Sequence, residues 1–190
     1  MENKIKVYVA GPDVFLPNYN DIMITQWEIV KKFNLDNKIE LVFPVESEVN
    51  LDEIKSLYKK GLAIRDGNKN LIKSCDCVIA NLSPFRSLEP DVGTSFEVGF
   101  ASALEKSVYV YTVNKDEMIK KYSGKNSKIA ENTSVENFQM PFNLMLSPNE
   151  KSSIHTSFIK ALEELIKDKL DIDVKDLKWF IFFQNKDYLN

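Results

Sequence analysis

The sequence predicts an α/β fold: a doubly wound, flavodoxin-like parallel sheet of about five strands flanked by helices. Two observations support this prediction. Strand-like and helix-like apolar patterns alternate along the 190 residues, as they do when helices connect parallel strands. Residues 77–82 form a nearly continuous apolar run, which is typical of a central strand buried on both faces. Such sheets bind ligands at the carboxyl ends of their strands, so we expect function in the loops after residues 10, 82 and 113.

The first 74 residues contain four periodic apolar segments. They predict, in order, a strand, a helix, a strand and a helix over residues 5–10, 20–33, 41–43 and 56–74. The first strand ends at the turn Gly11-Pro12 and the second at Pro44, because proline cannot continue a strand ladder. A glycine in the second helix, Gly61 or Gly67, could interrupt it.

The rest of the chain continues the alternation. Its segments are the strand 77–82, a loop over 84–90, a helix over 94–104, a strand over 108–113, a polar surface helix fragment with a mobile loop over 115–137, and a helix over 154–170. The apolar tail 177–183 is either a last strand or a patch that meets another subunit. We expect the whole chain, 1–190, to form one domain, with 171–190 as its C-terminal extension.

The charge balance excludes several classes of partner. Lys and Arg total 25 against 28 acidic residues, and the net charge of −3 offers no basic excess for a nucleic-acid polymer or an anionic membrane. No stretch approaches the roughly 20 apolar residues that span a bilayer, and no signal-peptide pattern opens the chain. We therefore expect a cytoplasmic protein that binds neither nucleic acid nor membrane.

The cysteines do not indicate a metal or disulfide site. Cys75 and Cys77 lie two positions apart, on one face of a strand, where bridging each other is unfavourable. The single histidine, His155, is distant in sequence, so a zinc site is not expected. Both cysteines are interpreted as buried apolar residues of a reducing compartment. No G-x-G-x-x-G spacing follows the first strand, and we expect no cofactor and no metal.

The polar residues that follow the most apolar strand are the best candidates for chemistry. Residues 81–97 run from this strand into the next helix and contain Asp91 and, six positions later, Glu97. The neighbours of Glu97 are apolar, and a carboxylate in such surroundings is costly unless it is paired or used. The residues alone leave two interpretations open, a structural cap or salt bridge and a catalytic carboxylate.

Four blocks of the sequence together resemble the nucleoside 2-deoxyribosyltransferases. In the family's order they are YVAGPDVF (8–15), IKSCDCVIANLSPFR (72–86), EPDVGTSFEVGFA (89–101) and PFNLM (141–145). The resemblance implies an enzyme of nucleoside salvage that moves a 2-deoxyribosyl group between nucleobases through a covalent glycosyl-enzyme. Its nucleophile would be Glu97, and its partners would be deoxyribonucleosides and free nucleobases.

The resemblance also implies roles for other residues. Tyr8 matches a tyrosine that contacts the catalytic glutamate, and Asp91 matches the residue that binds the sugar 5′-hydroxyl, where its charge would repel a 5′-phosphate. Asn143 and Met145 match residues that a neighbouring subunit supplies, which implies a homo-oligomer with shared active sites. The structural alternatives are a strand tyrosine at Tyr8 and a core methionine at Met145, whereas a helix cap at Asp91 is compatible with its binding role. The further substrate-binding candidates are Gly11, Phe15, Asn68 and Gly93.

Two positions depart from the family pattern. Asn68 stands where some members carry an aspartate that is proposed to protonate the leaving base, and an amide has no titratable proton. Asp66, Asp13, Asn68 through hydrogen bonding, or solvent could take that role. Ser87 replaces a common glycine, which leaves the loop conformation open.

The sequence leaves the activity itself open in three ways. The base preference, purine or pyrimidine, and the size of the oligomer are not indicated. An N-glycoside hydrolase acting on nucleosides or their 5′-monophosphates would use the same nucleophile. A non-catalytic nucleoside-binding protein is the alternative from another class.

Overall fold

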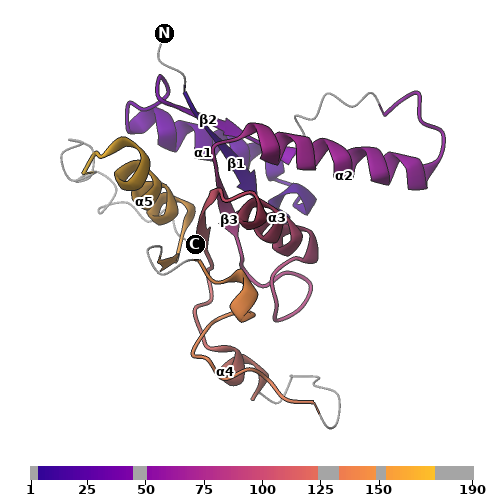
Figure 1. The fold of residues 1–190 in the computed structure, drawn as a ribbon, viewed down its shortest axis with the longest axis vertical. Coiled ribbons are helices and arrows are strands. Elements are labelled where there is room, and N and C mark those ends of the chain that lie inside the picture. The colour runs from indigo at the N-terminus through magenta and orange to yellow at the C-terminus, as the bar shows by residue number, and fades with distance from the viewer. Residues whose placement is uncertain (1–3, 45–50, 124–132, 149–152, 174–190) are drawn as a thin grey trace.

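The computed structural model describes residues 4–44, 51–123, 133–148 and 153–173, and Figure 1 shows its fold. Five strands pair in parallel in the order β2-β1-β3-β4-β5. Their bounds are β1 Ile5–Ala10, β2 Ile39–Val42, β3 Cys77–Asn81, β4 Ser107–Tyr111 and β5 Ile154–His155. From β1 the chain moves to one side for β2 and to the other side for β3, so the order reverses between β1 and β3. This confirms the predicted doubly wound sheet of five parallel strands.

Five α-helices and two short 3₁₀ helices complete the described fold. The α-helices are α1 Tyr19–Lys32, α2 Leu57–Ser74, α3 Val92–Ala103, α4 Met118–Tyr122 and α5 Phe158–Leu170, and the 3₁₀ helices are η1 Pro12–Phe15 and η3 Leu144–Leu146. The predicted interruption of α2 at Gly61 or Gly67 is wrong, because the helix runs unbroken through both. None of the described helices is long and apolar enough to cross a membrane.

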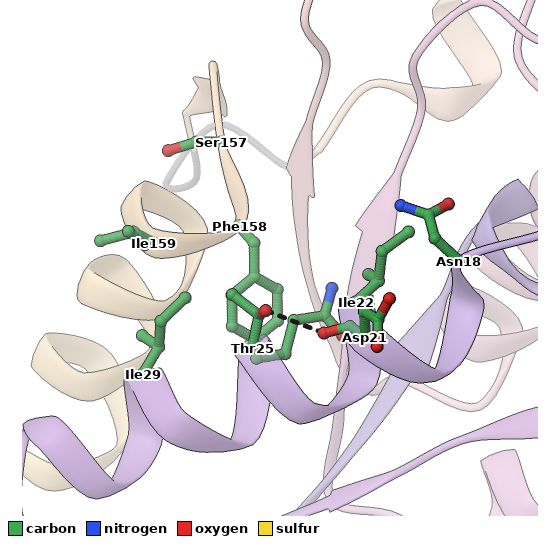
Figure 2. Close-up of a pocket in the computed structure, with 9 residues that line it drawn as sticks. Asn18, Asp21, Ile22, Thr25, Ile29, Ser157, Phe158 and Ile159 are labelled. Atoms are coloured by element: carbon green, nitrogen blue, oxygen red, sulfur yellow. Dashed lines mark hydrogen bonds between the residues drawn. The ribbon is translucent and has the colours of Figure 1, made fainter. Parts of the chain in front are cut away.

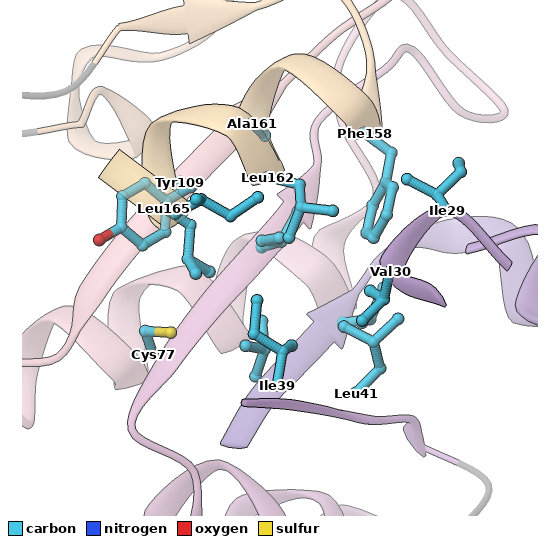
Figure 3. Packing of buried hydrophobic residues seen from close by; sticks show 14 of the residues in the cluster. Ile29, Val30, Ile39, Leu41, Cys77, Tyr109, Phe158, Ala161, Leu162 and Leu165 are labelled. Atoms are coloured by element: carbon cyan, nitrogen blue, oxygen red, sulfur yellow. The ribbon is translucent and has the colours of Figure 1, made fainter. Parts of the chain in front are cut away.

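The two faces of the sheet bury separate apolar clusters because side chains alternate along each strand. One face packs against α1 and α5, where residues such as Leu162 and Leu165 are fully buried (Figure 3). The other face packs against α2 and α3 and contains Tyr8, Val78 and Ala80. Burial of apolar surface stabilises the folded state by about 25 cal/mol per Å², so the helices on both faces stabilise the sheet.

The fifth strand corrects one prediction. Residues 154–155 were expected at the start of a helix, but Ile154 pairs with Val110 and His155 with Tyr111. The helix begins only at Phe158, because the Ser157 hydroxyl caps it by accepting a hydrogen bond from the Lys160 amide. The apolar tail 177–183, the alternative for a last strand, lies outside the described residues.

The segment after β4 projects away from the sheet. In Figure 1, α4 lies at the far end of the long axis of the molecule. Of the predicted polar segment 115–137, the structure describes the helix fragment, and residues 124–132 lie outside the description. The Lys121 ammonium donates to the Pro141 carbonyl, and the Met118 amide donates to the Met140 carbonyl at 2.8 Å. These bonds tie α4 to the chain that leads into η3.

Candidate active site

Tyr8 and Glu97 meet beneath helix α3. Tyr8 lies in β1 with no exposed surface, and its hydroxyl donates a hydrogen bond of 2.8 Å to Glu97 Oε1. Glu97 lies in the second turn of α3, which packs over β1, β3 and β4. The structure thus brings together two residues that the sequence analysis assigned to one site.

The surroundings of this pair favour the uncharged form of each group. Burial raises the pKa of the Glu97 carboxyl to about 7, with a further rise from the Asp91 carboxylate, while the hydrogen bond from Tyr8 lowers it in part. Burial, with the charge of Glu97, also raises the pKa of Tyr8 far above its usual range. Tyr8 is therefore a permanent donor, and Glu97 changes charge near neutral pH, as many active-site carboxylates do.

Asp91 caps the helix that carries Glu97. Its Oδ2 accepts hydrogen bonds from the Thr94 amide at 2.9 Å and the Thr94 hydroxyl at 3.2 Å. In the described part of the chain, Oδ1 has no hydrogen-bond partner, so its lone pairs are available to a ligand. A Cβ on Gly93 would lie 3.0 Å from Oδ2, which explains a small residue here. The cap and a binding role are compatible, as the sequence analysis expected.

Gly11 leaves room for a second carboxylate at the end of β1. A Cβ on Gly11 would lie 2.8 Å from Asp13 Oδ2 and 3.0 Å from the Asn81 Cβ. The Asn81 amide donates to both oxygens of Asp13, at 3.1 and 3.2 Å, and its own Oδ1 accepts from the Ser83 amide. Burial raises the pKa of Asp13, and the bond from Asn81 lowers it in part. From the sequence, Asp13 was only one possible proton donor, and no role was predicted for Asn81.

Phe15 belongs to a stack that joins the loops after β1 and β3. Its ring, 56% exposed, lies 5.7 Å from the Phe85 ring at an interplanar angle of 20°. The Arg86 guanidinium lies 4.7 Å from the Phe15 ring centre and 4.6 Å from that of Phe85, within cation–π range. Arg86 is the left-handed residue of its loop, with φ 57°, while Ser87 bonds to Glu89. These contacts define the conformation of the loop, which the replacement of a common glycine by Ser87 had left open.

The two candidates on α2 have different surroundings. Asp66 is 55% exposed and its Oδ1 lies 2.8 Å from the Arg65 guanidinium. Asn68 is partly buried, and its buried Oδ1 has no hydrogen-bond partner among the described residues. An unpaired buried acceptor is costly, so Asn68 differs from Asp66, whose carboxylate is exposed and paired.

Within the described residues of the single chain, Asn143 and Met145 make no hydrogen bond to Tyr8 or Glu97, although η3 contacts α3. The Asn143 side chain donates to Glu136 Oε1 at 2.8 Å and accepts from the Met145 amide at 3.0 Å. Met145 is 78% exposed, so the prediction of a core methionine as the alternative is wrong. Their predicted role in a neighbouring site is not tested by one chain.

Cys75 and Cys77 are both free and buried. The expectation that they share one face of a strand is wrong, because Cys75 ends α2 and packs in the same cluster as Tyr8, while Cys77 in β3 belongs to the cluster on the other face of the sheet. Within the described ranges, no group of three or more His, Cys, Asp or Glu residues is placed to hold a metal ion.

A separate groove lies on the opposite face of the sheet. Figure 2 shows it between α1 and α5, with a volume of about 280 Å³. Its lining is Asn18, Asp21, Ile22, Thr25, Gln26, Ile29, Ser157, Phe158 and Ile159. The Thr25 hydroxyl donates to the Asp21 carbonyl. Most of the exposed surface of the groove is apolar, and none of its lining residues belongs to the Tyr8–Glu97 site.

The sequence of this chain matches that of a known protein family. A family model for nucleoside 2-deoxyribosyltransferase matches residues 7–145, a range that includes Tyr8, Asp91, Glu97 and Asn143. An uncharacterized protein of Schizosaccharomyces pombe is 30% identical over 109 residues, which are 57% of this chain and 50% of that protein. The chain therefore spans half the length of this curated relative.

Solved structures share the fold. A 2-desoxiribosyltransferase from Leishmania mexicana matches with a TM-score of 0.68 and 34% identity, covering 88% of this chain and 99% of that one. A conserved protein from Enterococcus faecalis V583 matches with a TM-score of 0.52 and 21% identity over the same shares, which is a likeness of fold alone.

Proposed function

The chain belongs to the nucleoside 2-deoxyribosyltransferase family, and from this premise we propose that it exchanges the nucleobase of 2′-deoxyribonucleosides. The reaction would serve nucleoside salvage in the cytoplasm, and two free, buried thiols are compatible with a reducing compartment. The observation that carries the proposal is the partly buried Glu97 carboxylate, held by the Tyr8 hydroxyl at 2.8 Å.

Glu97 has the properties that the nucleophile requires. Cleavage of an N-glycosidic bond builds positive charge at C1′, which a carboxylate beneath the sugar first stabilises and then captures as an ester. Tyr8 fixes the direction of one oxygen, so the other oxygen, Oε2, is left for C1′. A second base then attacks the ester from the opposite face, and two inversions give net retention.

Asp91 supports free nucleosides as the substrates. Its Oδ1 can accept a hydrogen bond from the sugar 5′-hydroxyl while Oδ2 keeps the helix cap. A 5′-phosphate in the same place would be repelled by the negative charge of the Asp91 carboxylate. The phosphate and Asp91 together would also raise the free-energy cost of ionising Glu97. We therefore propose that 5′-monophosphates are poor substrates.

A second copy of the chain would complete the site. Within the described chain, Asn143 and Met145 form no hydrogen bond with Glu97, and Met145 is 78% exposed. Helix α3 also exposes apolar side chains, including Val92 at 83% and Phe96 at 53%. Apolar surface of this kind is favourable to cover. We propose a homo-oligomer in which residues 141–145 of one subunit lie against the sugar site of the next.

A base-exchange assay tests the proposal. The enzyme is incubated with a deoxynucleoside alone and with a second free base, and products are separated by chromatography. Formation of the new nucleoside well above release of free sugar supports the transferase. Release of free sugar at the same rate with and without the second base would show a hydrolase, and binding without turnover would show a nucleoside-binding protein. Intact-protein mass spectrometry should detect a deoxyribosyl adduct that Glu97→Ala loses.

A further inference from the structure

Two carboxyl groups approach the crevice between β1 and β3 from opposite faces of the sheet. Tyr8 belongs to the cluster beneath α2 and α3, so its partner Glu97 lies on that face. Asn81 follows Ala80 of the same cluster in β3, so strand alternation turns its side chain to the other face. Asp13 is bonded to Asn81 and interacts with Tyr111, which belongs to the cluster beneath α1 and α5.

This crevice is where the strand order reverses, and ligands of doubly wound sheets bind at such points. A nucleoside that presents C1′ to Glu97 would extend its base over the edge of the sheet toward Asp13. The stack of Phe15 on Phe85, with the Arg86 guanidinium over both rings, bridges the two loops at this edge and offers planar groups on which a base can stack.

The contacts of Asp13 orient its carboxyl group without neutralising it. The Asn81 amide cannot turn over, because its Oδ1 accepts from the Ser83 amide and its Nδ2 must face Asp13. Within the described residues, no lysine or arginine pairs with Asp13. A partly buried carboxylate without a cation is costly to maintain for structure alone.

We propose that Asp13 is the acid that protonates the leaving nucleobase, an assignment that rests on the transfer reaction proposed above. The protonated carboxyl of Asp13 gives its proton to a ring nitrogen as the C1′–N bond breaks and its electron pair passes to the base. A Glu97 oxygen forms the C1′–O bond, and a neutral base departs. In the second half, the incoming base loses its N–H proton to the Asp13 carboxylate as its nitrogen displaces Glu97.

The other candidates fit this role less well. Asp66 is half exposed and paired with Arg65, so solvent and the guanidinium already satisfy its carboxylate. Asn68 has no titratable proton, although it can accept a hydrogen bond from the base. Burial of Asp13 raises its pKa and so increases the fraction that carries a proton at neutral pH.

Donors that differ in their need for protonation test this assignment. Exchange is measured with 2′-deoxyguanosine and 7-methyl-2′-deoxyguanosine, whose methylated base leaves neutral without a proton, and with 2′-deoxyuridine and its 5-fluoro derivative, whose base is a better leaving group. Asp13→Asn keeps an acceptor for Asn81 but has no acidic proton. Its kcat should fall about 100-fold or more on the unmodified donors and less than about 10-fold on the activated donor of each pair.

Further variants separate the outcomes. Asp66→Asn is the control and should behave as the wild type. If thermal unfolding shows that Asp13→Asn does not fold, Asp13→Ser replaces it, because serine is a smaller acceptor for Asn81. Equal losses on both donors of a pair, unchanged kcat in Asp13→Asn, or the selective loss in Asp66→Asn would each overturn the assignment. A wild-type protein that releases no base from any of the four donors would instead refute the proposed function, on which the assignment depends.

Discussion

The Tyr8 hydroxyl and the Glu97 carboxylate are separated by 89 positions in the sequence and by 2.8 Å in space. Their hydrogen bond joins β1 to α3 at the point where the strand order of the sheet reverses. It also couples two ionisations, because the charge of Glu97 raises the pKa of Tyr8, and the Tyr8 donor lowers that of Glu97.

Tyr8→Phe removes this donor and fills the same buried space. Without the hydrogen bond, the pKa of Glu97 should rise above about 7, so the acid limb of kcat/KM for base exchange should move to higher pH. At neutral pH we expect a loss of about 10- to 100-fold, since a hydrogen bond to a charged group is worth about 1.5 to 3 kcal/mol. The check is a pH profile of kcat/KM for both proteins, and an unmoved acid limb would contradict the coupling.

Glu97→Ala should lower base exchange by several orders of magnitude, because the carboxylate acts mainly in the transition state. Thermal unfolding of the variant should remain a single cooperative transition. Steady-state exchange and nucleoside binding by calorimetry, measured together, distinguish loss of chemistry from loss of the pocket. Near wild-type exchange by a folded Glu97→Ala protein would rule out the proposed nucleophile.

Glu97→Gln should stabilise the fold in a pH-dependent manner. The folded-state pKa of about 7 lies above the usual value of 4.5, so the wild type loses stability as pH rises from 4.5 through 7, when a charge must form in partly buried surroundings. The neutral amide avoids this loss, which amounts to on the order of 1 to 3 kcal/mol. Chemical denaturation below pH 4.5 and above pH 7 measures it. The stabilisation should appear only at the higher pH, and an equal effect at both would point to packing instead.

Asp91→Ser and Asp91→Asn separate the charge of this residue from its role as a cap. Both replacements can cap α3, so the helix should persist, and Asp91→Ala serves as the control that loses the cap. We expect the wild type to use deoxynucleosides far better than their 5′-monophosphates. The ratio of kcat/KM values should fall by about 10-fold or more in the uncharged variants, since Coulomb repulsion is removed. Equal use of both substrates by the wild type would contradict the assignment of Asp91.

Mixed oligomers test whether active sites are shared. Asn143→Ala and Glu97→Ala chains, each weak or inactive alone, are co-expressed with different tags, and the mixed species is purified. In a dimer with shared sites, one of the two sites of each mixed pair receives both intact residues, so the purified mixed species should recover about half of wild-type activity. Light scattering gives the assembly size. A monomer, or no recovery in a verified mixed oligomer, would show that one chain builds its own site.

The sequence predicted the elements whose signals are local and strong. The buried run that became β3 and the amphipathic pattern of α1 identified both elements, and the family blocks brought Tyr8 and Glu97 into one hypothesis. The strand β5 could not be recognised, because two residues carry no periodicity and their pairing with Val110 and Tyr111 depends on tertiary contacts.

The second carboxylate of the site was also hard to identify from sequence. Asp13 follows a Gly-Pro turn and reads as an ordinary turn residue, and its importance depends on burial and on the Asn81 amide 68 positions away. Gly11 gave a usable signal, since a glycine directly after a strand often marks a close approach of two segments. The aromatic stack of Phe15 and Phe85 likewise exists only once β1 and β3 are neighbours.

The cap formed by Asp91 restricts how this enzyme lineage can change its substrate. A residue that only bound the sugar could mutate freely, but a residue that also begins α3 is limited to side chains that accept a hydrogen bond from the Thr94 amide. Asp, Asn, Ser and Thr satisfy that limit, and among them only Asp carries charge. One step within this small set could therefore open the pocket to phosphorylated substrates without unravelling the helix beneath the nucleophile. The need to cap α3 would then exclude most other substitutions at this position during evolution, while the few that change substrate specificity remain possible.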